Sequence, residues 1–293
     1  MMLNKLIYKT LVNHDSLNNM LAIYNDQPAV FYKLIPEDSG IGWNNESHFP
    51  RLNFSINVQA HRKRKCFGSL KIQIMCFDTE ITSEEIETEI NECLNNIFLQ
   101  EDGHLYYISW AKSETFHESE NCQNINSNAD TLNIYFDIIE YPNSETLDPD
   151  PIGAMILYTK SVIKEAVMIG IDNNQEIFHV NDKNPAFYFR LASVNTDHDS
   201  NAAVWMNCKI AIHIFTPSQE FRIKWAAYLM NLLAVDGEIV MSDESPMFVK
   251  DIKLNGRSDY LREGQLLLST EYGLPRYRQE KKKIVETAFN MDV

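Results

Sequence analysis

Hydrophobic and polar residues alternate in two stretches of the chain that lie nearly half its length apart. Residues 69–77 and 207–215 place apolar side chains at every second position, which is the period of a β-strand with one buried face. The first stretch is followed by Thr-x-x-Glu at 82–85 and the second by Thr-x-x-Gln at 216–219, the pattern of a capping box at the start of a helix. The sequence therefore predicts a strand-and-helix unit that occurs twice.

The same order of elements continues on both sides of this unit. Each half is predicted to begin with a helix and a proline-led strand and to end with two more strands: 3–13, 50–56, 105–110 and 132–141 in the first half, and 152–168, 185–191, 247–252 and 266–272 in the second. The spacing between matching elements drifts, as loop insertions in diverged copies would make it. Two unrelated halves could share such a pattern by chance, but five elements in one order with the same cap favour a duplicated module.

Apolar stripes predict how the two capped helices pack. The apolar positions repeat on one side of each helix: Ile86, Ile90, Leu94 and Ile97 in the first, and Phe221, Trp225, Leu229, Leu232 and Leu233 in the second. Such stripes nearly always pack on a sheet. We therefore expect an α+β fold with two similar domains, each a mostly antiparallel sheet with helices packed on one face.

A linker is predicted between the halves. Residues 141–151 contain three prolines and no apolar periodicity, so this segment should run extended. A boundary near Asp148 divides the chain into domains 1–147 and 148–293. The second domain is predicted to contain an additional strand at 176–180.

The charge is divided unequally between the halves. The net charge is −15, of which residues 1–150 contribute −13 and residues 151–293 contribute −2. A strongly acidic surface repels nucleic acid, so we expect no sequence-specific DNA binding through a broad basic face. The sequence has no run of 18 apolar residues and no signal-peptide pattern at its amino terminus, so we expect a protein made and kept in the cytosol that does not contact membranes.

Catalytic motifs are absent from the sequence. It contains no G-x-S-x-G, P-loop, H-E-x-x-H or G-x-G-x-x-G pattern. The acidic pairs Asp148/Asp150 and Asp197/Asp199 are predicted to lie in polar loops, where nothing indicates a pocket that shifts carboxylate pKa values apart. The sequence therefore predicts no enzyme and no cofactor.

The cysteines and histidines give no clear metal site. The five cysteines show no C-x-x-C spacing and are expected to be free, buried and reduced. The nearest approach to a metal-binding cluster is formed by His104, His117 and Cys122, whose spacing matches no common site. No bound metal is expected.

Two basic segments stand out in this acidic chain. The first consists of His61, Arg62, Lys63, Arg64 and Lys65, between two predicted strands at the tip of a long hairpin. It is either a solvated tip that keeps a sheet edge soluble, or an arm that contacts phosphates or an acidic face of a neighbouring subunit. The second lies in the carboxy-terminal tail and consists of Arg276, Arg278, Lys281, Lys282 and Lys283, where either docking on a neighbour or a frayed end is consistent with the composition.

The order of predicted elements, together with the opening at residues 6–11 and 15–17, resembles the tail terminator, or tail completion, proteins of tailed bacteriophages and related contractile particles. The resemblance covers most of residues 3–141 and, more faintly, 152–272. It lies in patterns and not in signature residues. Members of the family are mostly single units, whereas this chain has two.

The resemblance implies a structural virion protein at the head–tail junction, made in the host cytoplasm. It implies a six-fold homo-oligomeric ring that contacts the tail tube protein and a neck or connector protein and lets DNA pass through its lumen. Six chains could each place one copy around the lumen, or three chains could form a pseudo-six-fold ring. The unequal charges of the halves favour six chains.

Other classes remain as alternatives. A different neck, connector or baseplate protein would lack catalytic motifs in the same way. An enzyme that acts through Cys66, Cys122 or His117 is a more distant alternative, and a binding module that recruits a host protein is another.

Overall fold

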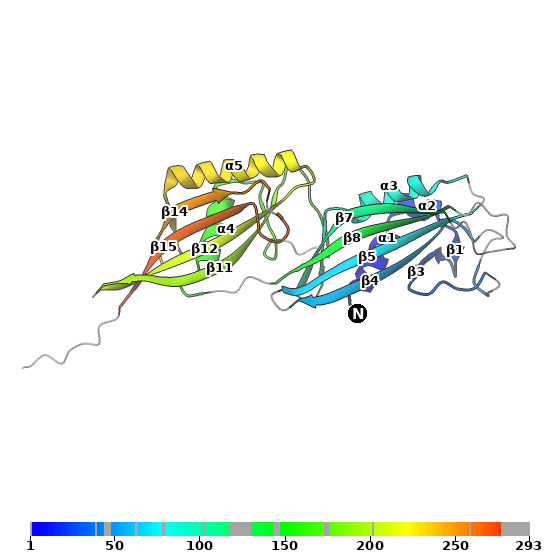
Figure 1. Cartoon of the computed structure of the whole chain (residues 1–293), viewed down its shortest axis with the longest axis horizontal. Helices are drawn as coiled ribbons and strands as arrows, with labels where there is room; N and C mark the ends of the chain where they lie inside the picture. Colours follow the sequence, from blue (N-terminus) through cyan, green and yellow to red (C-terminus); the bar gives the residue numbers. More distant parts are fainter. Residues whose placement is uncertain are drawn as a thin grey trace, which may run out of the picture.

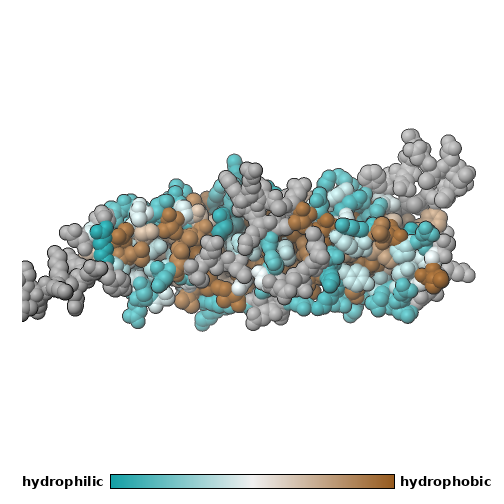
Figure 2. Space-filling view, turned by 90° about the horizontal axis from the view of Figure 1, so that it is seen from below, coloured by the Kyte–Doolittle hydropathy of each residue, from teal (hydrophilic) through white to brown (hydrophobic). Residues whose placement is uncertain are grey.

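The computed structural model contains two curled β-sheets and few helices, and its two sheet-dominated halves lie end to end along the long axis of the molecule (Figure 1). The structure describes residues 2–38, 40–43, 48–61, 64–77, 80–101, 103–117, 130–142, 147–172, 176–200, 202–257 and 259–276. On the side seen in Figure 2, hydrophobic and hydrophilic side chains interleave along the length of the molecule. The expected mixture of helices with mostly antiparallel sheets is present.

The first half contains three helices and a large sheet. Its elements are α1 (Met2–Val12), α2 (Asp15–Met20), β1 (Ile23–Tyr24), β2 (Gln27–Pro28), β3 (Val30–Tyr32), β4 (Arg51–His61), β5 (Arg64–Cys76), α3 (Ser83–Leu94), β6 (Ile97–Glu101), β7 (His104–His117) and β8 (Asp130–Tyr141). β1 and β2 form a separate small hairpin, and the large sheet has the strand order β10-β6-β7-β8-β5-β4-β3. All pairs in it are antiparallel except β3 with β4.

The second half contains two helices and a six-stranded sheet. Its elements are α4 (Pro151–Val162), β9 (Val167–Met168), β10 (Ile177–His179), β11 (Ala186–Asp199), β12 (Ala203–Phe215), α5 (Gln219–Asp236), β13 (Glu238–Val240), β14 (Pro246–Leu254) and β15 (Leu266–Pro275). The strand order is β13-β14-β15-β12-β11-β9. Here too a short parallel strand, β9, lies beside the long hairpin.

The two sheets have the same topology once β10 is set aside. The order β6-β7-β8-β5-β4-β3 in the first sheet corresponds strand by strand to β13-β14-β15-β12-β11-β9 in the second. In both halves the helix α3 or α5 follows the second strand of the long hairpin and precedes the edge strand. The repeated order that the alternation indicated is therefore a property of the fold.

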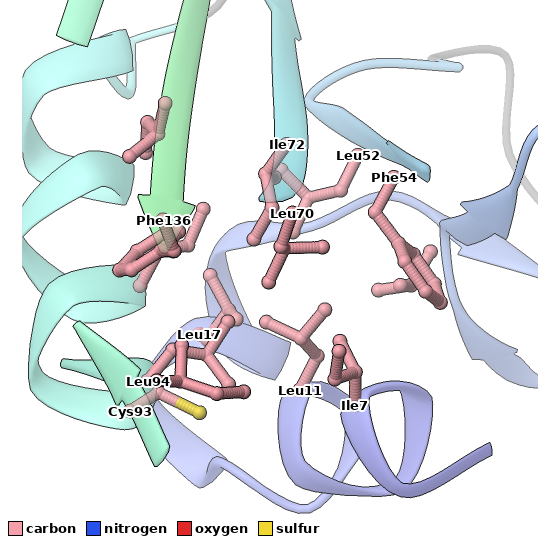
Figure 3. Close-up of a cluster of buried hydrophobic side chains, with 14 of the residues drawn as sticks. Ile7, Leu11, Leu17, Leu52, Phe54, Leu70, Ile72, Cys93, Leu94 and Phe136 are labelled. Atoms are coloured by element: carbon pink, nitrogen blue, oxygen red, sulfur yellow. The ribbon is translucent and has the colours of Figure 1, made fainter. Parts of the chain in front are cut away.

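The core of the first half lies between its sheet and its helices. Along β4 and β5 buried residues alternate with less buried ones, as a strand with one covered face requires. Figure 3 shows the side chains from α1, α2, α3 and the strands pointing toward one another, among them Ile7, Leu17, Leu70, Leu94 and Phe136. Each fully buried large apolar side chain stabilises the fold by about 1.5–3 kcal/mol relative to an exposed one.

The core of the second half forms in the same place, with α4 and α5 against the sheet. On α5 the buried residues are Ala226, Leu229 and Leu233. Phe221, which the apolar stripe placed in the core, is 39% exposed. The prediction was wrong at this position because Phe221 lies in the first turn of α5, which begins at Gln219, and its side chain lines a pocket between α5 and the end of α4.

The two helix caps differ. Thr82 forms the predicted capping box: its hydroxyl accepts a hydrogen bond from the Glu85 amide at 3.2 Å, and its own amide donates to the Glu85 carboxylate at 2.9 Å. The second predicted box is wrong. Ser218, not Thr216, is the N-cap of α5 and makes no side-chain cap bond, and the Thr216 hydroxyl instead donates to the Ser218 carbonyl at 2.9 Å.

Two further predictions in the second half need correction. The predicted helix 152–168 ends at Val162, and Val167–Met168 form the parallel strand β9. The additional strand predicted at 176–180 exists as β10, but it pairs with β6 of the first sheet and not with its own sheet. The two halves therefore share a sheet.

Candidate functional site

The junction between the halves is the most elaborate feature of the described structure. β10 is antiparallel to β6, with Phe178 opposite Phe98 and His179 opposite Ile97. Backbone hydrogen bonds extend the contact, since the Gln100 amide donates to the Glu176 carbonyl at 2.9 Å. A strand of the second half thus covers the edge of the first sheet, which would otherwise be open to pairing with other chains.

An apolar cluster stands beside this strand pair. It contains residues from both halves: Phe98, Leu105, Tyr107, Ile139 and Tyr141 from the first, and Ile169, Val180, Ala186, Tyr188, Phe215 and Leu261 from the second. On β7 and β8 these residues lie on the face opposite the helix-covered core, which takes Ile108 and Ile138. The sheet faces that carry no helices therefore meet at this end of each half.

Phe215 is the centre of the junction. Its ring lies 4.9 Å from that of Phe98 in an edge-to-face arrangement, 5.0 Å from that of Tyr107 and 5.5 Å from that of Tyr141. Edge-to-face aromatic pairs contribute about 0.5–1.5 kcal/mol beyond the burial of their surface. The aromatic residues of the two halves therefore hold the halves together specifically.

The polar groups of the junction are hydrogen-bonded across it. The Tyr141 hydroxyl donates to the Leu261 carbonyl at 2.6 Å, and the Tyr188 hydroxyl donates to the Pro142 carbonyl at 2.7 Å. Burial raises the pKa of Tyr188 to about 12 and raises the pKa of Tyr107 well above its usual range. Both phenols stay neutral at physiological pH, so they act as structural donors and not as acid–base groups.

Sequence reasoning missed this junction, although a signal for it exists. In residues 105–108 and 138–139 the apolar side chains are consecutive instead of alternating, which is typical of strands buried on both faces. Alternation identifies only the helix-covered face of these strands.

Two pockets flank α4. One, of about 410 Å³, lies at the junction and is lined by apolar residues together with Asp150 and Lys160. Asp150 caps α4 by accepting from the Ile152 amide at 3.0 Å, and Lys160 forms an ion pair with Asp172. The other, of about 360 Å³, lies between the end of α4 and α5. The charged groups of the junction pocket thus serve the fold.

The predicted basic hairpin lies at the turn between β4 and β5. His61 is paired with Arg64 across the hairpin, so the predicted tip position is correct for the backbone. Arg62 and Lys63 lie outside the described residues, and the side chains of His61, Arg64 and Lys65 are not among those described. The contact role of this segment remains a prediction.

The predicted basic tail begins where β15 ends. The Arg276 amide donates to the Ala202 carbonyl at 2.8 Å, and the Arg276 side chain is exposed. Arg278, Lys281, Lys282 and Lys283 lie outside the described residues. This segment, too, remains a predicted contact.

The acidic run at 197–199 lies on a strand and not in a loop, because β11 extends to Asp199. His198 lies 3.1 Å from the Asp197 carboxylate and 3.9 Å from the Glu271 carboxylate. These three side chains could hold a metal ion by distance, but Glu271 also forms an ion pair with Lys250. A cation would have to compete with that ammonium group.

The other acidic and histidine residues that the sequence analysis considered do not form a site in the described structure. Asp150 is the helix cap described above. His104 and His117 stand at opposite ends of β7, about 40 Å apart at roughly 3.3 Å per residue, so they cannot share an ion. Cys122 lies outside the described residues.

Three cysteines are buried, as predicted: Cys76, Cys93 and Cys208. Burial, together with the charge of Glu89, raises the pKa of Cys93 to about 12, and burial raises the pKa of Cys208 to about 11. The Cys93 thiol donates to the Thr10 carbonyl at 3.4 Å. These two thiols are protonated at physiological pH and are not nucleophiles.

Comparison of the sequence with known protein families and with curated proteins finds no match. In the part of the chain that the structure describes, no helix combines the length and apolar character needed to cross a membrane.

Proposed function

We propose that this chain is a structural virion protein that forms a ring at the head-proximal end of a bacteriophage, or phage-like, tail tube. There it ends polymerisation of the tube and joins the tail to the neck. The observation that carries the proposal is the pair of sheets with one strand order, joined through an added strand and an aromatic cluster. A duplicated module that binds its neighbour through a sheet edge is suited to ring assembly.

The charge supports a passage for DNA. With a net charge of −15, the body of the ring repels phosphates and lets DNA move through the lumen without sequence-specific contact. The partners in this proposal are further copies of the chain, the tail tube protein and a neck or connector protein. The ring contains six chains, or three chains in a pseudo-six-fold arrangement.

Particles assembled without this protein test the proposal. We expect tail tubes of uncontrolled length, or tails that are not attached to heads, because nothing stops the tube or links it to the neck. Electron microscopy of the particles, with the wild-type gene supplied in trans as the control, measures both. Tails of normal length on normal heads would reject the proposed function.

The two basic segments are proposed as contacts to those partners. Charge reversal of Arg62 and Lys63, or of Lys281, Lys282 and Lys283, to Glu should reduce the attachment of tails to heads, and most strongly at low salt, where the charges are least screened. Lys209→Glu, at an exposed position in the middle of β12, is the matched control. If both charge reversals leave the attachment of tails to heads unchanged, these segments are solvent-exposed and do not contact the partners.

A further inference from the structure

The two sheets differ at one pair of corresponding strands. Strand β6 of the first sheet is covered on its outer side, whereas the corresponding strand of the second sheet is an open edge. β6 pairs with β10 on its outer side, whereas its counterpart β13 is the last strand of its sheet in the described structure. An open edge strand is a ready template for another strand.

The ladders show which residues correspond on these two edges. Ile97 pairs with Ile108, and Ile239 pairs with Met247; all four are buried in the helix-covered cores. The next pair along each ladder is therefore Phe98 with Tyr107 in the first sheet, and Val240 with Pro246 in the second.

These corresponding pairs have opposite exposure. Phe98 and Tyr107 are fully buried in the junction, each with 0% exposure, whereas Val240 is 63% exposed and Pro246 is exposed. The second sheet thus presents, uncovered, the position through which the first sheet binds its neighbour.

The strand that covers the first sheet comes from a connection that the first half also has. β10 lies between β9 and β11, and the corresponding connection runs between β3 and β4. We name the described residues 169–172 and 176–185 the second arm, and the described residues 33–38, 40–43 and 48–50 the first arm.

The two arms differ in what covers their apolar side chains. In the second arm Ile169 and Val180 are buried in the junction, and Phe178 packs against it. In the first arm Leu34 is 84% exposed and Ile41 is 99% exposed, the highest value among the large apolar side chains that the structure describes.

The first arm is nevertheless held in place at its base. The Asn25 amide donates to the Gly42 carbonyl at 2.7 Å, and the Trp43 ring lies 5.0 Å from that of Tyr24. The Arg51 guanidinium lies 5.8 Å from the centre of the Trp43 ring. Ile41 is therefore presented to solvent by an ordered segment.

We propose that the β13 edge of one copy receives the first arm of a second copy, as the β6 edge receives the second arm within each chain, with Ile41 and Val240 both covered by the contact. The occupant is a second copy because the same pairing of an edge strand with an arm already joins the two halves within each chain. The inference rests on the proposed function, for which it names the contact between subunits. Such a contact is head-to-tail, and repetition of it produces a ring if the rotation closes.

Two single substitutions separate the two sides of this contact. Ile41→Lys disables the first arm and Val240→Lys disables the edge, while both leave the buried cores untouched because the side chains are exposed. Val235→Lys, at an 84% exposed position on α5, is the matched control. Mass photometry and sedimentation velocity measure the size distribution of each purified full-length chain.

We expect the wild type and Val235→Lys to form assemblies larger than a dimer, and each of the other two variants to remain monomeric. An equimolar mixture of Ile41→Lys and Val240→Lys should form dimers and nothing larger, because each variant keeps one functional side of the contact. The proposal would be overturned if either variant alone formed assemblies of the same size as those of the wild type. It would also be overturned if the mixture, or the wild type itself, stayed monomeric.

The outcomes also separate this contact from the proposed function. Rings that both variants leave intact would reject the contact and leave the role in the tail standing. Arm-dependent assembly together with normal tails in particles that lack the protein would reject the role in the tail and keep the contact.

Discussion

At the scale of single residues, the two copies of the module use different chemistry at the same place. α3 begins with a reciprocal capping box between Thr82 and Glu85. At the start of α5 the Ser218 amide donates to the Asp182 carboxylate at 3.1 Å, and the Arg222 guanidinium donates to the Thr216 carbonyl at 2.6 Å. The second copy thus replaces the capping box by a contact to Asp182, in the connection that carries β10, and by a local bond from Arg222.

Thr82→Ala should lower the free energy of unfolding by about 1 kcal/mol, because the Glu85 amide loses the Thr82 hydroxyl that accepts its hydrogen bond. Ser218→Ala is the matched substitution at the N-cap of α5 and should have close to no effect, since that side chain makes no cap bond. Urea unfolding followed by circular dichroism measures both variants. Equal losses would contradict the assignment of the two caps.

Single residues also show how far the sequence could predict the fold. The alternation of Leu70, Ile72 and Ile74 was sufficient to predict the strand and its buried face, because a period of two has only one interpretation in a sheet that is covered on one face. The sequence matched Leu105 with Met247, but the two side chains lie on opposite faces of their sheets. Leu105 lies in the junction, and Met247 lies in the second core. Both faces of β7 are apolar at that point, so periodicity could not choose between them.

At the scale of elements, the short strand β10 decides how the halves are joined. It has only three residues, and its pairing with β6 depends on contacts between residues far apart in the sequence. A local pattern can predict that residues 176–180 are extended, but it contains no information on which sheet they join. The proposed contact that covers Val240 and Ile41 could not be predicted from the sequence for the same reason, because it depends on the strand order around these residues.

Apolar contacts outweigh charge at this element. Lys9 of α1 forms an ion pair with Glu176 beside β10, but both side chains are more than half exposed, and exposed pairs contribute about 0–1 kcal/mol. A fully buried phenylalanine such as Phe98 contributes about 1.5–3 kcal/mol. The junction is therefore held by its aromatic residues.

His179 on β10 should make the stability of the junction depend on pH. Partial burial of the ring, and then the charge of His14, lower the pKa of His179 below its usual value of 6.5. A histidine with a lowered pKa in the folded state binds fewer protons there than in the unfolded state. Its stabilising effect is therefore present above about pH 6.5 and is lost as the pH falls toward the lowered pKa.

We expect the urea midpoint of the wild type to fall between about pH 7.5 and pH 5.5, and the fall to be smaller in His179→Gln, which cannot take up the proton. His104→Gln, at an exposed histidine of β7 paired with Glu140, is the control for a general effect of losing a histidine. Identical pH dependence in the wild type and His179→Gln would exclude this role for His179.

At the scale of the whole molecule, the two halves are similar in topology and unequal in surface. The outer side of α3 carries exposed Glu84, Glu85 and Glu92, whereas that of α5 carries Phe221, Tyr228 and Val235. Helices at the same position in the fold thus face different surroundings. In a ring built from these modules, a different neighbour for each half would maintain this difference.

The shared sheet makes the first half dependent on the second. Residues 1–147 expressed alone should self-associate or aggregate, because the β6 edge and the apolar side chains of Phe98, Tyr107 and Tyr141 lose their cover. Co-expression with residues 148–293 should restore a soluble one-to-one complex, measured by size-exclusion chromatography with light scattering. The second half carrying Phe178→Asp is the matched control and should fail to restore it, because a carboxylate would then face the Phe98 side of the junction without a partner. A first half that stays monomeric and does not bind the second would show that β10 and the aromatic cluster contribute little, and that the two modules are held together by the linker alone.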